Sequence, residues 1–391
     1  MMATELVAGG LRVRAGSSCQ TEPEAAVQEL LQGIEQPNIG LVVVFASSSF
    51  DLDRLALLLA ARLGSTTVIG CTTAGEIGPA GYLDNSLSAV SIHRDDLRFE
   101  VAVIEQLSHF DFRAGQKFAH NLKESLRQRI PDLASNNAFA FMLIDGLCVR
   151  EEAVARAFYD GLGGIPLVGG SAGDSLAFKE TRVLFGGRFI RDAALLLVAS
   201  TPFPFMVFKT QHFVSGNERL VVTGAIPQQR IVTEINGCPA AEEYARAVGI
   251  EINQLERLDP MIFAAYPVTV RIGNAEFVRS IQRMNPDGSL TFYCAIDEGI
   301  VFKVAKGVDM IDNLEAALEN VIQRIGQPSL ILGCDCILRQ LESKQRGIRE
   351  RIGEILAGCN VVGFSTYGEQ YGGMHINQTF TGVAIGNGRR N

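Results

Sequence analysis

The stretch Gly70-Cys-Thr-Thr-Ala-Gly-Glu76 recurs near the other end of the chain as Gly363-Phe-Ser-Thr-Tyr-Gly-Glu369. The same offset of 293 residues aligns Gly70–Ile92 with Gly363–Ile385 without a gap. A third and shorter copy is Gly169-Gly-Ser-Ala-Gly-Asp174. Self-similarity of this kind indicates a fold built from repeated units, each contributing one glycine-rich loop.

Each copy follows the same order of predicted elements. An apolar strand comes first, at Leu41–Ala46, Phe139–Ile144 and Ser329–Cys334. An amphipathic helix follows, and a second short strand then runs directly into the glycine-rich loop. A strand–helix–strand crossover favours a parallel pair of strands with a helix covering the sheet.

Other segments predict helices and antiparallel hairpins. We expect helices over 23–34, 114–129 and 310–325, where apolar residues recur at helical spacing. We expect one hairpin over 277–296 and another that pairs 87–93 with 97–104. The sequence therefore predicts an α/β protein of two domains, 1–214 and 215–391. Their sheets should be mixed and mostly parallel, built from repeated strand–helix–strand–loop units.

Composition excludes several classes of function. The 391 residues carry a formal net charge of −8, and no basic run favours nucleic acid or an anionic membrane as a partner. The longest uncharged apolar stretch, 193–208, is interrupted by Pro202 and Pro204, and the first residues do not resemble a signal peptide. We therefore expect a cytoplasmic protein whose eight cysteines are reduced.

The motifs of common enzyme classes are absent from the sequence. It contains no GxGxxG, Walker P-loop, GxSxG or HExxH pattern, and no nucleophile stands beside a base. We therefore expect a protein that is not an enzyme.

The glycine-rich loops are candidate ligand sites, because open α/β sheets bind ligands beyond the carboxyl ends of their strands. Hydroxyl groups and carboxylates at these loops are suited to a small polar ligand. The alternative is structural, with glycine serving the turn and the acids bonding local amides. The candidates are Thr72, Thr73, Glu76, Asp174, Thr366 and Glu369.

Taken together, the three loop motifs and the strand Phe141–Asp145 resemble the FIST family, with an N-terminal and a C-terminal module. The resemblance implies a sensory protein that works with a separate histidine kinase or cyclic-di-GMP enzyme and binds small ligands such as amino acids. Two-module members of this size include the NosP group, which bind haem b and sense nitric oxide.

His375 is the candidate haem ligand among the five histidines. Its equivalent in the first copy is Tyr82, so the shared scaffold does not require histidine there. A neutral imidazole is a good ligand for ferrous iron, and Tyr367, Tyr371 and Met374 lie close in sequence. The alternative is a structural hydrogen bond from His375 to Glu369.

These features lead to two hypotheses for function. The first is a cytoplasmic haem-based nitric oxide sensor that signals through a separate histidine kinase or cyclic-di-GMP enzyme. The second is a haem-free sensor of an amino acid or similar metabolite. Either is compatible with a homo-oligomer.

Overall fold

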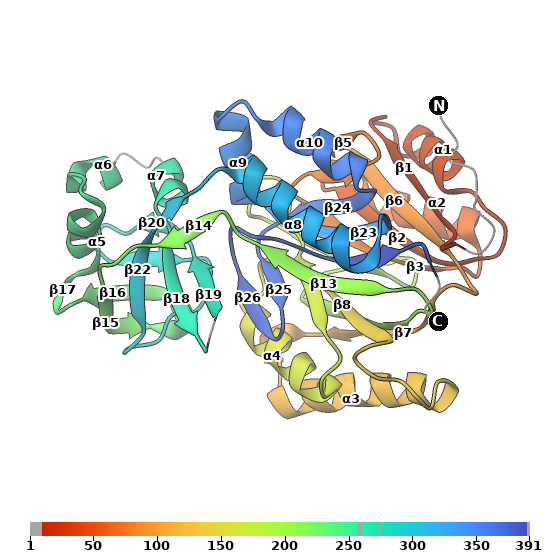
Figure 1. The fold of residues 1–391 in the computed structure, drawn as a ribbon, viewed down its shortest axis with the longest axis horizontal. Helices are drawn as coiled ribbons and strands as arrows, with labels where there is room; N and C mark the ends of the chain where they lie inside the picture. Colours follow the sequence, from red (N-terminus) through yellow and green to blue (C-terminus); the bar gives the residue numbers. More distant parts are fainter. Residues whose placement is uncertain (1–9, 257–259, 274, 389–391) are drawn as a thin grey trace.

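The structure, a computed structural model, describes residues 10–256, 260–273 and 275–388. Three six-stranded sheets with helices on their outer sides form a body, and a fourth sheet of nine strands forms an inserted domain, residues 213–307. Figure 1 shows the inserted domain at the left and the body at the right, with α1 and α2, α3 and α4, and α8 to α10 around the outside of the body.

The body consists of three repeats, in which strands and helices follow one another in a similar order. The first repeat contains β1 (Val13–Ser18), α1 (Pro23–Ile34), β2 (Ile39–Ser47), α2 (Leu52–Leu63), β3 (Thr67–Thr73), β4 (Glu76–Gly78), β5 (Gly81–Leu83) and β6 (Leu87–His93). The second contains β7 (Arg98–Glu105), η1 (Leu107–His109), α3 (Phe112–Arg129), β8 (Ala138–Ile144), α4 (Glu151–Leu162), β9 (Leu167–Ser171), β10 (Val183–Phe185), β11 (Arg188–Ile190) and β12 (Ala193–Ser200).

The third repeat is split by the inserted domain. It begins with β13 (Phe205–Thr210) and resumes with α8 (Met310–Ile325), β23 (Pro328–Cys336), α9 (Ile337–Gln345), α10 (Arg349–Gly358), β24 (Val361–Thr366), β25 (Glu369–Tyr371), β26 (Met374–Ile376) and β27 (Phe380–Gly386). The inserted domain holds β14 (Phe213–Ser215), β15 (Leu220–Ile226), η2 (Pro227–Gln229), β16 (Ile231–Ile235), β17 (Cys238–Pro239), α5 (Ala240–Val248), α6 (Ile252–Glu256), α7 (Pro260–Ala265), β18 (Val268–Ile272), β19 (Ala275–Arg279), β20 (Ile281–Met284), β21 (Leu290–Phe292) and β22 (Val301–Gly307).

The three sheets of the body exchange hairpins in a ring. Their strand orders are β1-β6-β2-β3-β10-β11, β7-β12-β8-β9-β25-β26 and β13-β27-β23-β24-β4-β5. In each sheet the last two strands come from another repeat. The second repeat completes the first sheet, the third completes the second, and the first completes the third. The repeats therefore have an approximate threefold arrangement in which no sheet is complete without its neighbour.

The prediction of α/β domains with mixed sheets is confirmed, but the sheets are not mostly parallel. Each sheet of the body contains one parallel pair, β2 with β3, β8 with β9, and β23 with β24. The other pairings described in these sheets are antiparallel, because an exchanged hairpin and a returning strand flank each crossover pair.

The helices predicted over 23–34 and 310–325 have the predicted bounds, and that over 114–129 begins at Phe112. The hairpin within 277–296 is present as β20 and β21. The predicted pairing of 87–93 with 97–104 is wrong. Both neighbouring positions of β6 are occupied, by β1 and β2, so the chain passes to another sheet, where β7 pairs with β12.

The predicted division at residue 214 falls where the chain passes from β13 into the inserted domain. The chain returns to the body at α8, so the segment beyond 214 contributes to both parts. The assignment of one module to each side of residue 214 stays a prediction.

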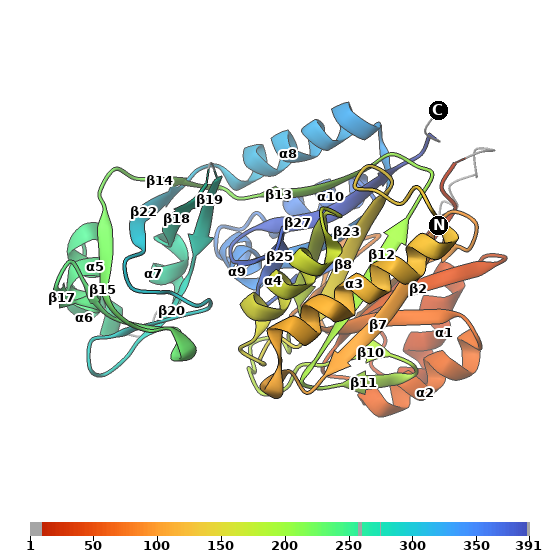
Figure 2. The same cartoon turned by 90° about the horizontal axis from the view of Figure 1, so that it is seen from below.

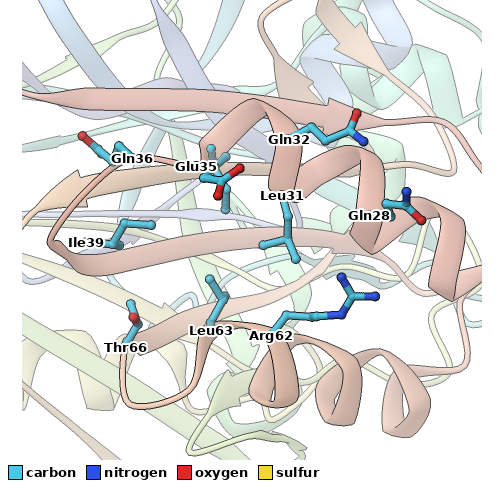
Figure 3. Close-up of a pocket in the computed structure, with 10 residues that line it drawn as sticks. Gln28, Leu31, Gln32, Glu35, Gln36, Ile39, Arg62, Leu63 and Thr66 are labelled. Atoms are coloured by element: carbon cyan, nitrogen blue, oxygen red, sulfur yellow. The ribbon is translucent and has the colours of Figure 1, made fainter.

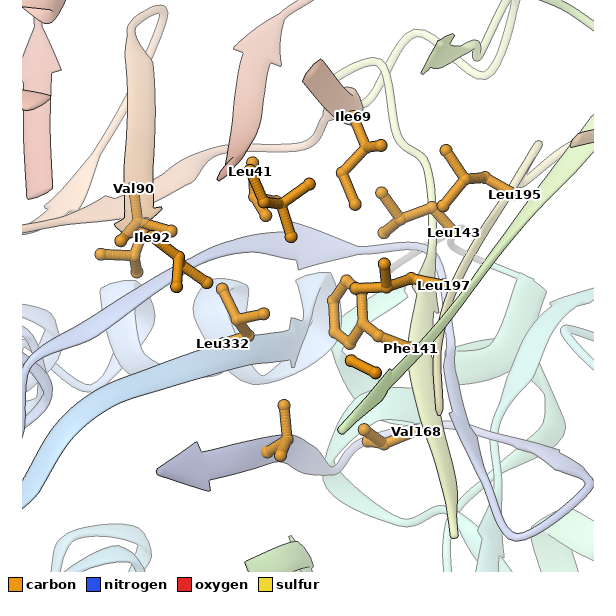
Figure 4. Packing of buried hydrophobic residues seen from close by; sticks show 14 of the residues in the cluster. Leu41, Ile69, Val90, Ile92, Phe141, Leu143, Val168, Leu195, Leu197 and Leu332 are labelled. Atoms are coloured by element: carbon orange, nitrogen blue, oxygen red, sulfur yellow. The ribbon is translucent and has the colours of Figure 1, made fainter. Parts of the chain in front are cut away.

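One apolar core lies between the inner faces of the three sheets. Figure 4 shows Leu41 and Ile69 of the first sheet, Phe141 of the second and Leu332 of the third pointing toward one another. Separate apolar clusters lie on the outer faces, beneath α1 and α2, beneath α3 and α4, and beneath α8 and α10. Figure 2, seen from below, shows α3 and α4 across the second sheet. Burial on both faces explains why the crossover strands are continuously apolar.

The first glycine of each loop motif is required by the close approach of two strands. A Cβ atom added at Gly70 would lie 1.8 Å from the carbonyl oxygen of Val44 on the neighbouring parallel strand. The equivalent distances are 2.0 Å at Gly169 and 2.0 Å at Gly363. No side chain fits at this position in any of the three repeats.

Beyond these glycines, the three loops bond to one another in a ring. Ala74 N–H donates to Ser365 C=O at 3.0 Å, joining the first repeat to the third. Tyr367 N–H donates to Ser171 C=O at 3.2 Å, and Gly173 N–H donates to Thr72 C=O at 3.0 Å. The loops therefore hold the three sheets together at the carboxyl ends of their parallel strands.

We predict that Gly70→Ala lowers the free energy of unfolding by about 2 kcal/mol or more, because the added methyl group meets backbone that cannot move aside. Gly358→Ala is the matched control, since no atom lies within 4 Å of its added carbon. Chemical denaturation measures both. Equal stability of the two variants would contradict the close-approach explanation.

Candidate functional site

Two of the predicted carboxylates are held in identical structural clamps. Glu76 accepts hydrogen bonds from the Thr73 hydroxyl and from the backbone and hydroxyl of Ser86, the last two at 3.0 and 2.6 Å. In the third repeat, Glu369 accepts the equivalent bonds from the Thr366 hydroxyl and from Thr379. Both carboxyl groups are fully buried. Each clamp ties a glycine-rich loop to the strand that follows its hairpin.

Asp174 and Thr72 also have partners within the protein. Asp174 accepts from the backbone N–H groups of residues 178, 179 and 180 at 2.7–2.9 Å and from the Tyr367 hydroxyl. The Thr72 hydroxyl accepts from Arg182 N–H at 3.0 Å. All six residues of the predicted small-ligand set thus bond to protein groups, and their binding of a ligand stays a prediction.

The four residues of the predicted haem set do not converge. His375 pairs with Gln370 across the β25–β26 hairpin, whereas Tyr371 pairs with Met374 one position further along. Successive positions of a strand face opposite sides, so Tyr371 and Met374 point away from His375. Tyr367 stacks on Phe178 with ring centroids 4.5 Å apart.

His375 is 2% exposed and has hydrogen-bond partners on its ring. Its Nδ1 accepts from Gln370 Nε2 at 3.1 Å, and Gln370 Nε2 also donates to Ser171 Oγ at 2.8 Å. The backbone of Tyr293 in the inserted domain lies beside the ring. Burial lowers the pKa of His375 to about 4, so the ring is neutral at pH 7. The alternative bond to Glu369 is not formed.

The other repeats show that the fold itself does not need polar residues at this place. The equivalent hairpin pairs are Ile77 with Tyr82 and Leu184 with Phe189. Those pairs pack into the apolar clusters beneath α10 and α2. Of the three hairpins, the one that faces α4 carries Gln370 and His375, and this hairpin contacts the inserted domain between β26 and β19.

We call the residues gathered at this contact the polar junction, defined as Arg279, Ser280, Gly368, Gln370, His375 and Asn377. The inserted domain contributes the first two, and Arg279 Nη1 donates to His375 C=O at 3.1 Å. A Cβ atom added at Gly368 would lie 2.2 Å from His375 Cε1 and 3.1 Å from Asn377 Nδ2. Glycine at 368 therefore leaves room for the His375 imidazole and the Asn377 amide beside the loop.

Three side chains of the polar junction carry buried polar atoms without partners. Both amide atoms of Asn377, the Oε1 atom of Gln370 and the Oγ atom of Ser280 are buried with no hydrogen bond in the described chain. The same holds for atoms of four further residues, Gln340, Ser365, Gln378 and Thr381. Arg349 belongs to another contact, where it pairs with Asp84 at 2.9 Å.

A cluster of one arginine and two glutamates borders the polar junction. Arg230 of the inserted domain pairs with Glu151 at 2.6 Å and with Glu152 at 2.8 Å, at the start of α4. Glu152 also accepts from Ala295 N–H at 2.8 Å. These contacts hold the inserted domain against the body on one side of His375.

Sequence reasoning selected His375 but missed the other side chains of the polar junction. The signal that was available is the break in the repeat, since Ile77 and Tyr82 are replaced by Gln370 and His375. Nothing in the sequence near Arg279 or Ser280 marks them, because their role depends on contact with a strand about 90 residues away.

Two open grooves lie away from this site. One of about 650 Å³ runs between α1 and α2, and Figure 3 shows Leu31, Leu63 and Arg62 along it. Another of about 600 Å³ lies beside β7. Both are at the amino ends of β2 and β3, whereas the glycine-rich loops are at the carboxyl ends.

In the ranges that the structure describes, no group of three or more His, Cys, Asp and Glu side chains is arranged to hold a metal ion. None of the described helices has the length and apolar character needed to cross a membrane.

We predict that stability falls as pH rises because of the two clamped carboxyls. Burial raises the pKa of Glu369 to about 8 and that of Glu76 to about 7, against an ordinary value of 4.5. The folded chain thus keeps protons that the unfolded chain releases. The stabilisation is complete below pH 4.5 and is lost progressively up to about pH 8.

Glu369→Gln should flatten this dependence, because the amide does not titrate. Urea unfolding between pH 5 and pH 8 measures the slope, and the exposed Glu354→Gln serves as the control. A slope in Glu369→Gln equal to that of the unchanged protein would mean that Glu369 is ionised in the fold.

Comparisons with known proteins identify two family domains, which meet within the inserted domain. The FIST N domain matches residues 40–238, and the FIST C domain matches residues 240–372. An uncharacterised protein of Methanocaldococcus jannaschii is 21% identical over 384 residues, which cover 88% of this chain and 73% of that protein.

A solved chorismatase structure aligns over 97% of this chain and 100% of that chain, with 8% identity and a TM-score of 0.34, a similarity too low to carry an argument. The two domain matches, in contrast, span most of the chain. They imply a sensory and signalling role, which is consistent with a protein that is not an enzyme. The chain belongs to the FIST family, with an N and a C domain in sequence.

Proposed function

We propose that this protein is a sensor that binds a small polar molecule at the polar junction. The observation that carries the proposal is the set of unpaired buried amide and hydroxyl atoms there. An unpaired buried polar group costs about 1–3 kcal/mol, and folded proteins contain few of them. A ligand with several donors and acceptors would satisfy Asn377, Gln370 and Ser280 together.

The placement of these residues also supports a way to report binding. Asn377 and Gln370 belong to the body, and Ser280 belongs to the inserted domain. A molecule bonded to the body and to the inserted domain favours conformations in which these two parts are in contact. Binding therefore shifts the conformational equilibrium of the inserted domain relative to the body. We infer that a separate signalling protein, such as a histidine kinase or a cyclic-di-GMP enzyme, reads this change.

Haem-based sensing of nitric oxide through His375 is less well supported. The ring is bonded to Gln370, and it lies against the Gly368 loop. Tyr371 and Met374, which were expected to cover a macrocycle, face the other side of the hairpin. The residues around His375 in this arrangement do not fit a haem, so no step is assigned to one.

Asn377→Leu tests the small-ligand proposal. Because both amide atoms lack partners, we predict that this change leaves the free energy of unfolding of the ligand-free protein unchanged or raises it. Thr379→Val, two residues away, removes a hydroxyl bonded to Glu369 at 2.6 Å and should cost about 1–3 kcal/mol.

The second readout is thermal stabilisation by the dialysable small molecules of a cell extract. The unchanged protein and Thr379→Val should both be stabilised, and Asn377→Leu should not. If Asn377→Leu is destabilised as strongly as Thr379→Val, or is stabilised by the extract as strongly as the unchanged protein, the amide is not part of a ligand site.

A haemin titration tests the haem hypothesis. We predict no saturable Soret band that depends on His375, because its ring is packed and bonded. His375→Ala is compared with His120→Ala, since His120 is exposed on α3. A band that shifts with nitric oxide and is lost only in His375→Ala would support haem sensing and contradict the small-ligand proposal.

A further inference from the structure

Arg279 is a nearly buried cation without a charged partner. Arg279 is 9% exposed, and no carboxylate in the described chain lies within ion-pairing distance of its guanidinium group. Nη1 donates to two backbone carbonyls, Val278 at 3.3 Å and His375 at 3.1 Å. A guanidinium has five N–H donors, so most of its bonding capacity is unused by these contacts.

No neighbouring carboxylate pairs directly with Arg279. The two carboxylates nearby, Glu151 and Glu152, both pair with Arg230. His375 is neutral because burial lowers its pKa to about 4. Glu369 lies on the opposite face of the hairpin, one position from Gln370, where Thr366 and Thr379 hold it. Arg279 therefore has no carboxylate of its own within ion-pairing distance in the described chain.

A second cation lies beside the same strand. Lys209 Nζ lies 5.0 Å from the ring centroid of Phe277 and donates to Gln211 Oε1 at 3.3 Å. Phe277 and Arg279 share one face of β19, because residues two apart in a strand point the same way. Lys209, like Arg279, has no carboxylate partner within ion-pairing distance in the described ranges.

We propose that the molecule bound at the polar junction carries an anionic group, a carboxylate or a phosphate, that pairs with Arg279. This proposal rests on the proposed function and specifies its ligand. A buried charge is tolerated when it is paired, and the planar guanidinium fork matches two oxygens of a carboxylate or phosphate. The uncharged part of the molecule then bonds to Asn377, Gln370 and Ser280. Its anionic group pairs with Arg279 and so links the molecule to the inserted domain.

The test uses the full chain and the dialysable fraction of a cell extract, separated by anion exchange into retained and unretained molecules. Thermal unfolding is followed for the unchanged protein, Arg279→Gln and Arg283→Gln. Arg283 is the matched control, because it is an exposed arginine of the same domain. Treatment of the retained fraction with a phosphatase distinguishes a phosphate monoester from a carboxylate.

The proposal expects the retained fraction to raise the unfolding midpoint of the unchanged protein and of Arg283→Gln, and to leave Arg279→Gln unshifted. If only the unretained fraction stabilises the protein, and Asn377→Leu abolishes that effect, the ligand is not anionic. This result would overturn the anionic assignment but would support the ligand site. An equal shift in Arg279→Gln would also overturn it. No shift from either fraction would count against both the anionic ligand and the proposed function.

Without added molecules, Arg279→Gln gives a further check. An unpaired buried cation is a cost to the folded state, so its removal should not lower the midpoint. A large loss of stability in Arg279→Gln, with none in Arg283→Gln, would show that Arg279 serves the contact between the domains and overturn its assignment to a ligand.

Discussion

The hydrogen bonds that link the three glycine-rich loops are the constraint on which the body depends. Each loop must leave its strand, bond to the next repeat and send a hairpin onto that repeat's sheet. The backbone can do this only where the strands approach so closely that Gly70, Gly169 and Gly363 have no room for a side chain. One apolar core between the sheets follows from this ring.

Function is expected where the repetition is broken. The third repeat alone contains the inserted domain, and the hairpin beside that domain alone carries Gln370 and His375 in place of apolar or aromatic residues. The loop carboxylates, by contrast, are used alike in two repeats to hold the scaffold together. A residue that recurs with the same partners serves the fold, whereas the departures from the pattern mark the candidate site.

The sequence predicted the local elements well because they depend on nearby residues. The spacing of apolar residues placed α1 and α8 at their observed bounds, and the repeat located all three loops. The exchange of hairpins was not predictable, since pairing β4 with β24 joins segments nearly 300 residues apart and has no local signal. The hairpin wrongly predicted over 87–104 has the same cause, because β7 pairs with the distant strand β12 instead of β6.

The candidate site was only partly predictable for a related reason. His375 was recognisable as a departure from Tyr82 in the aligned repeat. Arg279 and Asn377 carry no motif, and they become informative only when burial and missing partners are known. The resemblance to the family indicated a sensor correctly, but it does not distinguish haem from a small polar ligand.

Hydrogen exchange followed by mass spectrometry tests the central claim most directly, that a small molecule bridges the body and the inserted domain at the polar junction. Backbone amides of 276–281 and 367–379 are compared with and without the dialysable fraction of a cell extract. The account predicts that both segments gain protection together and that Asn377→Leu abolishes the gain. Protection confined to the α1–α2 groove, or no change in either segment, would contradict it.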